Sequence, residues 1–259
     1  MKTTKYLLII ILIVTFSTGS VAAEPIMITI STDMNKIIFD GKWTFVTEWK
    51  RSSLNTLSYN DGMGIQLRTA HQDKFIYVLV DVVTMSQFSK HSDMATICFD
   101  GHNDKTTMAD EDDYCFVSTL GGNTSMTLQG GSPLALTDNF NKIPNPDGFI
   151  GIGGISDEND RYSSIPHTSY EFRIPTDVVG RSDTYGFYLG VYDAHSNKVY
   201  SWPQNITSDS PLKIPSPNKW GEIVSPDKSL AEFPWPFLSL LVAMTSIVYL
   251  TKRKRISFN

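Results

Sequence analysis

Six carboxylates lie between residues 100 and 113 of this 259-residue chain, and they are the side chains whose spacing most directly suggests a chemistry. Lys105 is the one cation among them, so the stretch carries a formal charge of −5. Ca²⁺ takes about six to eight hard oxygen ligands, and clustered carboxylates that supply them repel one another when no cation is present. A solvated acidic loop is the alternative, and an EF-hand is excluded because Lys105 occupies its glycine position. We expect a calcium site formed by Asp100, Asn103, Asp104, Asp110, Glu111, Asp112 and Asp113.

Two cysteines flank this acidic stretch, and the chain has no others. In an oxidising exterior a single pair most simply forms one disulfide, here Cys98 to Cys115. Such a bond stabilises a chain by about 3 kcal/mol in the loop-entropy model.

Aromatic side chains are the second candidate for a binding chemistry. The axial C–H groups of a sugar ring stack on a flat aromatic face, so a saccharide site needs one or two exposed Trp or Tyr rings. Trp49 and Trp202 are expected in the core. The residues expected to be exposed and to bind ligand are Trp43, Tyr59 and Tyr162, all beside polar or turn residues.

Haem ligation and catalysis are weaker alternatives. Haem would need inward-pointing histidine or methionine side chains, for which the chain offers His71, His91, His167 and His195 with Met63, Met85 and Met94. The sequence holds no Gly-x-Ser-x-Gly elbow, no His-Glu-x-x-His pair and no phosphate loop. We therefore expect no catalytic residues and no enzymatic activity.

The two ends of the chain predict where it works. Lys2 and Lys5 precede an apolar stretch at 7–16 and small residues at 21–23, which is typical of a signal peptide over 1–23. Residues 233–251 carry no charge, and as a helix they would span about 28 Å, close to a bilayer core of about 30 Å. Four cations at 252–255 favour the cytoplasmic side. The expected protein is a single-pass type I membrane protein with an extracellular domain.

Charge and modification signals agree with an exported domain. All 27 acidic residues but only 16 of the 22 cations lie in 24–232, which gives that part a formal charge of −11. So acidic a surface repels phosphate backbones, and nucleic acid is not an expected partner. Asn123 and Asn205 begin N-glycosylation sequons.

Short alternating segments predict the fold. We expect strands at 26–31, 64–70, 74–83, 94–99, 114–119, 125–129, 149–153, 169–174, 185–192 and 198–202, and one helical turn at 175–179. Many short strands joined by polar turns are typical of an all-β antiparallel sandwich. The expected organisation is a signal peptide at 1–23, a β-sandwich at 24–224, a stalk at 225–232, a transmembrane helix at 233–251 and a basic cytoplasmic tail at 252–259.

The order of several motifs resembles the family 9 carbohydrate-binding modules and the related DOMON-like domains. The motifs are Asp40-Gly41 followed by Glu48-Trp49, FIYVLVDV at 75–82, ICFDGHND at 97–104, YEFRIP at 170–175, GFYLGVYD at 186–193, SWP at 201–203 and KWG at 219–221. The resemblance implies a jelly-roll-like β-sandwich without catalytic residues, binding a sugar between aromatic rings, a loop calcium or, in one branch, a b-type haem. At the other end, Glu232-Phe233-Pro234 is similar to archaeal surface-protein anchor signals, with Ala231 in place of their first proline.

Together these patterns predict a non-catalytic binding module at the cell surface, with carbohydrate as ligand and one structural calcium. A haem electron-transfer domain and a structural envelope or adhesion protein are the alternatives.

Overall fold

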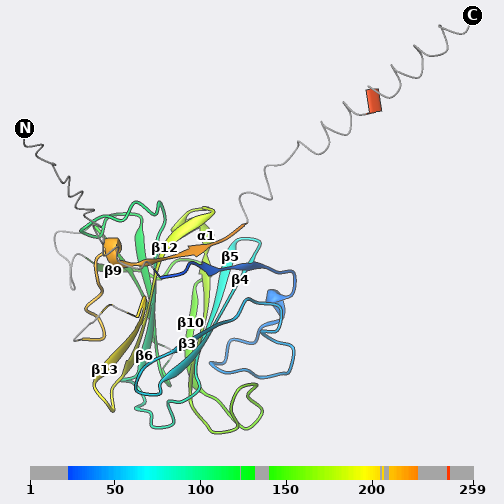
Figure 1. Cartoon of the computed structure of the whole chain (residues 1–259), viewed down its shortest axis with the longest axis vertical. Helices are drawn as coiled ribbons and strands as arrows, with labels where there is room; N and C mark the ends of the chain where they lie inside the picture. The colour runs from blue at the N-terminus through cyan, green and yellow to red at the C-terminus, as the bar shows by residue number, and fades with distance from the viewer. Residues whose placement is uncertain are drawn as a thin grey trace, which may run out of the picture.

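The computed structural model describes residues 23–122, 124–131, 140–204, 206, 210–226 and 244–245. Within this part the chain forms two β-sheets packed face to face, with one short helix and two 3₁₀ turns (Figure 1). The all-β sandwich is confirmed. The expected signal peptide, anchor helix and basic tail fall on residues that are almost all outside the described part, as do Asn123 and Asn205. In the residues that are described, no helix has the length and apolar character needed to cross a membrane.

The larger sheet has eight strands. Along the sheet they run β1 (Ile26–Met27), β14 (Gly221–Val224), β12 (Thr184–Asp193), β6 (Met94–Asp100), β7 (Asp113–Thr119), β8 (Ser125–Gln129) and β9 (Asn141–Ile143), and β13 (Lys198–Trp202) pairs with the remaining length of β12.

The smaller sheet has six strands. They run β10 (Ile150–Ile155), β11 (Thr168–Pro175), β5 (Phe75–Val82), β4 (Gly64–Gln72) and β2 (Thr29–Ile30), and β3 (Asn55–Ser58) also pairs with β4. The helix α1 (Thr176–Val179) follows β11, and the 3₁₀ turns are η1 (Met34–Lys36) and η2 (Pro217–Lys219).

Two features of the strands differ from the sequence-based expectation. The stretch at 26–31 forms two strands, because β1 pairs with β14 in one sheet and β2 pairs with β4 in the other, both in parallel. Strands β3, β9 and β14 were not predicted; each has only three or four residues, too few for alternation to be distinctive.

Both faces of the six-stranded sheet are buried at its central strand β5. Ile76, Val78, Val80 and Val82 of β5 pack between the sheets, where each buried side chain contributes about 1.5–3 kcal/mol. The opposite face of β5, with Tyr77, Leu79 and Asp81, is also buried. It is covered by the segment between β2 and β3, drawn in blue outside β4 and β5 in Figure 1.

The outer face of the eight-stranded sheet carries the disulfide. Cys98 of β6 and Cys115 of β7 are register partners on adjacent antiparallel strands and are bonded to each other. The bond is buried beneath Trp220 and Ile214, which belong to the segment that leads into β14. The predicted disulfide is confirmed.

Candidate functional site

Two buried carboxylates hold a loop at residues 38–49: Glu171 fixes it to the six-stranded sheet, and Glu48 bonds within the loop itself. Glu171 of β11 accepts hydrogen bonds from the N–H groups of Asp40 (3.0 Å) and Gly41 (2.8 Å) and from Nε1 of Trp49 (2.9 Å). Glu48 accepts the N–H groups of two further loop residues, at 2.8 and 2.7 Å. Such bonds satisfy backbone donors that would otherwise be buried without partners.

The same loop packs directly on the backbone of β10. A Cβ atom at Gly41 would lie 2.3 Å from the nitrogen of Gly154, and Gly41 has a positive φ of 82°. Only glycine combines this close approach with that backbone conformation. Lys42 then reaches Asp157 at 2.7 Å, which joins the loop to a second loop at residues 156–167.

An aromatic and arginine cluster lies where the two loops meet. The rings of Trp43 and Tyr162 pack edge to face, with centroids 5.8 Å apart. Arg68 of β4 lies 5.2 Å from the Trp43 ring and donates a 2.6 Å hydrogen bond from Nε to the hydroxyl of Tyr162. The exposed Arg161 lies 5.8 Å from the Trp43 ring. Trp43, Tyr162, Arg68 and Arg161 are called the Trp43 cluster below.

The three predicted ligand-binding aromatics are placed differently. Trp43 and Tyr162 come together in this cluster, but Trp43 is only 2% exposed, so its expected exposure is wrong. Its polar neighbours in the sequence do not reveal that loop 156–167 covers the ring. Tyr162 is half-buried. Tyr59 lies elsewhere, edge-on to Tyr200 with its hydroxyl bonded to the carbonyl of Ser201 at 2.9 Å.

The acidic loop between β6 and β7 brings three of its seven predicted ligands together. One carboxylate oxygen from each of Asp104, Asp110 and Asp112 lies within 4.8 Å of the other two. Asp100 instead accepts the N–H groups of Asp104 and Lys105 (3.3 and 3.2 Å). The three converging carboxylates of Asp104, Asp110 and Asp112 are called the acidic cluster below.

The remaining predicted ligands have other surroundings. Asp113 is buried and accepts the N–H group of Asp110 at 2.8 Å, while the side chain of Glu111 is exposed. Asn103 donates to Glu222 at 3.2 Å, and its Oδ1 is buried with no hydrogen-bond partner among the described residues.

Crowding of carboxylates shifts their acidity. The shared hydrogen bond with Asp112 raises the pKa of Asp110 to about 6. Burial raises the pKa of Asp113 to about 8, and the charges of nearby aspartates add to that shift. The pKa of Asp112 is lowered, because the opposing effect of burial is outweighed by hydrogen bonds from Asp110 and His102. Asp110 and Asp113 therefore give up their protons less readily than a free aspartate, and a cation bound nearby would lower their pKa values.

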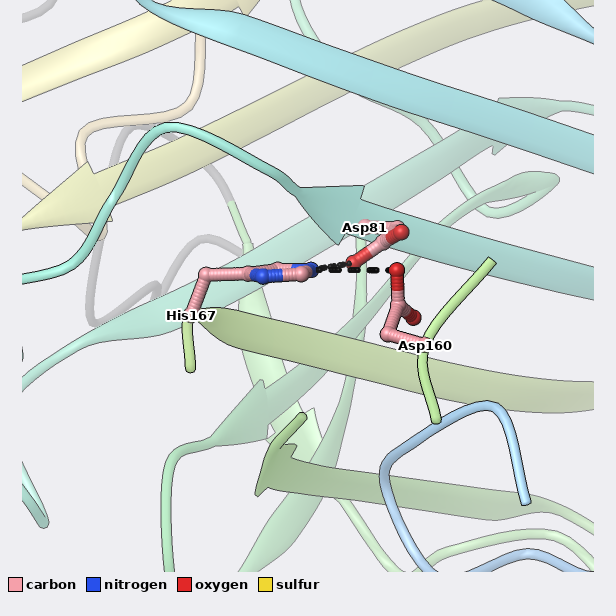
Figure 2. A group of neighbouring side chains, drawn as sticks. All are labelled: Asp81, Asp160 and His167. Carbon is pink, nitrogen blue, oxygen red and sulfur yellow. Dashed lines mark hydrogen bonds and ion pairs between the residues drawn. The ribbon is translucent and has the colours of Figure 1, made fainter. Parts of the chain in front are cut away.

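A further group of potential ligands was not predicted as a site. Asp81, Asp160 and His167 converge (Figure 2). Asp160 also accepts the N–H group of Tyr162, a member of the Trp43 cluster, at 2.7 Å. Of the three, only His167 figured among the candidate ligands, for haem. Asp81 lies within the strand expected at 74–83, and no local pattern ties it to Asp160, 79 positions later in the chain.

Comparisons with known proteins return structural matches. Two solved structures of a family 9 carbohydrate-binding module from Caldicellulosiruptor kristjanssonii are similar to this chain at 13% identity, one in complex with cellotriose and one with glucose. The cellotriose complex aligns over 78% of this chain and 93% of its own, with a TM-score of 0.49. The glucose complex aligns over 78% and 95%, with a TM-score of 0.48. No protein-family model and no curated protein matches the chain.

Proposed function

We propose that this chain is a non-catalytic carbohydrate-binding module held at the cell surface, and that it binds sugar at the Trp43 cluster. The observation that carries the proposal is the half-buried Tyr162 ring, which packs edge to face with Trp43 and accepts a hydrogen bond from Arg68 through its hydroxyl. A pre-positioned ring can accept the C–H face of a sugar without first losing side-chain entropy.

The polar groups around Tyr162 suit a hydroxylated ligand. Arg161 is exposed, and its guanidinium has several N–H donors to offer to sugar hydroxyls. The ion pair of Lys42 with Asp157 is about one-third exposed and adds a donor and an acceptor at the junction of the loops. One aromatic face with a few hydrogen bonds corresponds to micromolar to millimolar affinity.

A structural calcium completes the proposal for the exported domain. The acidic cluster supports it because three carboxylates converge there and the buried Oδ1 of Asn103 in the same loop has no partner among the described residues. Asp104, Asp110 and Asp112 are proposed to coordinate the calcium ion directly. Asp100 and Asp113 would act by holding the loop through their backbone hydrogen bonds.

Export and anchoring are proposed on the sequence alone. The signal-like residues 1–23 and the uncharged stretch at 233–251 with its basic tail support a type I anchor. The buried disulfide is consistent with an oxidising exterior. The similarity of residues 232–234 to archaeal anchor signals belongs to this part of the proposal.

The experiment is a glycan screen on the full chain, purified in mild detergent. A glycan that binds the wild type is expected to bind at least about tenfold more weakly to Tyr162→Ala. The variant loses the buried area of the ring and, beyond that area, an aromatic contact of about 0.5–1.5 kcal/mol. Tyr162→Phe keeps the ring but loses the hydroxyl that accepts the Arg68 hydrogen bond, so its affinity is expected to lie between those of the wild type and Tyr162→Ala.

Three outcomes would redirect the assignment. If no soluble glycan binds, the structural envelope or adhesion role takes precedence. If Tyr162→Ala binds as tightly as the wild type, the sugar site lies elsewhere. A Soret band at about 400 nm would indicate haem, although the ring of His167, one of the candidate haem ligands, contacts Asp81 and Ser156.

A further inference from the structure

Three side chains of metal-binding type converge where loop 156–167 meets the six-stranded sheet. Asp81 belongs to β5, His167 immediately precedes β11, and Asp160 lies in the loop (Figure 2). Nε2 of His167 is 2.7 Å from Oδ1 of Asp81 and 3.8 Å from Oδ1 of Asp160. No side chain of the three is more than 1% exposed. They form a closed cluster shielded from water.

The hydrogen bonds of His167 indicate which of its ring nitrogens carries a hydrogen. Nδ1 lies 2.7 Å from the carbonyl oxygen of Ile165 and 2.8 Å from the hydroxyl of Ser156. Because a carbonyl oxygen can only accept, Nδ1 carries a hydrogen. Metal-binding histidines commonly donate one N–H to a backbone carbonyl and coordinate the ion through the other nitrogen, which in His167 is the Nε2 that faces Oδ1 of Asp81.

Two carboxylate oxygens in the cluster lack partners. Oδ2 of Asp81 and Oδ2 of Asp160 are buried and have no hydrogen bond to any described residue. Oδ1 of Asp160, in contrast, accepts the N–H groups of Tyr162 (2.7 Å) and Ser163 (3.1 Å). Burying unpaired carboxylate oxygens is costly, and a coordinated cation removes that cost.

We propose that Asp81, Asp160 and His167 form a binding site for a zinc-class divalent transition-metal ion. The donor set of one imidazole nitrogen and two carboxylates suits zinc, whereas Ca²⁺ and Mg²⁺ take oxygen ligands. Zinc bonds of about 2.0–2.2 Å place tetrahedral ligand atoms about 3.4 Å apart. The observed distances of 2.7 and 3.8 Å lie on either side of that value.

The ion would join loop 156–167 to the sheet. Asp160 is two residues from Tyr162, so a metal shared with Asp81 would tie this part of the loop to strand β5. The metal would thereby set the position of the Tyr162 ring. This last consequence rests on the proposed function, whereas the metal site itself does not.

The test uses the full chain in mild detergent, stripped with chelator, dialysed and titrated with zinc chloride. Mass spectrometry is expected to find one tightly bound zinc per chain. The melting temperature is expected to rise by about 5–10 °C at a zinc concentration about a hundred times Kd. Calcium chloride at the same concentration should not displace the zinc.

Two variants localise the bound ion. Asp160→Asn keeps an Oδ1 that accepts the same two loop N–H groups, so the loop is retained while zinc binding weakens by at least about 100-fold. His102→Gln removes the exposed imidazole that pairs with Asp112 at 2.8 Å and should bind zinc like the wild type. Co²⁺ in place of zinc is expected to give visible absorption bands of nitrogen and oxygen ligation in the wild type, a readout that does not depend on how either variant folds.

The proposal is overturned if the wild type binds zinc no more tightly than Asp160→Asn, if His102→Gln abolishes binding, or if Co²⁺ shows no such bands. In the first case Asp81 and His167 are simply a buried ion pair. Glycan binding is measured on the same samples. Zinc bound without any glycan would contradict the proposed function and leave the metal site in place.

Discussion

Single buried carboxylates decide how the loops of this sandwich are held. Glu171 is fully buried, and no hydrogen bond to a cation is seen for it among the described residues; its partners are N–H groups of Asp40, Gly41 and Trp49. Burial raises the pKa of Glu171 to about 8, although the hydrogen bonds from Trp49 and Gly41 oppose the shift. The residue therefore ionises in the folded protein at a higher pH than in the unfolded chain.

The consequence is a stability that falls as pH rises. The contribution of Glu171 is fully present below its unfolded pKa of about 4.5 and is lost as pH rises through about 8. Glu171→Gln does not ionise. The variant is expected to melt below the wild type at pH 5, since its amide N–H₂ faces an N–H donor, and the difference should shrink by pH 9.

Thermal unfolding of both full-length proteins at pH 5, 7 and 9 checks this prediction. The difference between the two melting temperatures isolates Glu171, because all other titrating groups are common to both. A difference that is constant or grows with pH would contradict the raised pKa.

At the scale of elements, the strands could be predicted from the sequence, but the segments that pack over the outer faces of the sheets could not. The alternation in 74–83 predicts β5 and its two faces correctly. The burial of Trp43 depends on Glu171, 128 positions later in the chain, which anchors the neighbouring Asp40 and Gly41. A sequence motif shows the residues on each side of such a contact but not the contact itself.

The acidic loop shows the same limit. Its composition predicts a cation site, and the structure narrows the converging ligands to the three carboxylates of the acidic cluster. Which acids turn inward depends on backbone N–H groups, such as that of Lys105 toward Asp100, and not on residue type.

Calcium is expected to raise the melting temperature of the full chain by several degrees through this loop. Asp110→Asn should remove most of that rise. It should also make the calcium-free protein more stable than the calcium-free wild type, because the like charges at positions 110 and 112 no longer repel each other. The amide oxygen of the new side chain can still accept the N–H group of Asp112, as the carboxylate of Asp110 does at 3.3 Å.

Melting curves with calcium and with chelator measure both effects. Asp177→Asn is the control, since that side chain is 74% exposed on α1. An equal calcium response in the Asp110→Asn variant and the wild type would remove the acidic cluster as the site.

At the scale of the molecule, both outer faces of the sandwich are covered. Residues 34–49 cover the six-stranded sheet, and Trp220 with Ile214 covers the disulfide on the other. An open sheet face is therefore not offered to a ligand at either place, and recognition is left to the loops. Strands β1 and β14 pair side by side, so the sandwich begins and ends at one edge.

That edge is where the proposed tether would leave the domain. A chain that stops after Pro226 retains β14 (Gly221–Val224) and lacks residues 227–259. Expressed through a secretory route, it is expected in the soluble fraction, whereas the full chain should remain with membranes after alkaline carbonate extraction. Replacing Leu241 and Ala243 with Arg should release the full-length chain too, because each central charge costs about 2.5–3.5 kcal/mol in a membrane helix. Full-length chain in the carbonate supernatant would show that 233–251 is not an anchor, whereas truncated chain in the pellet would mean that the sandwich itself binds the membrane.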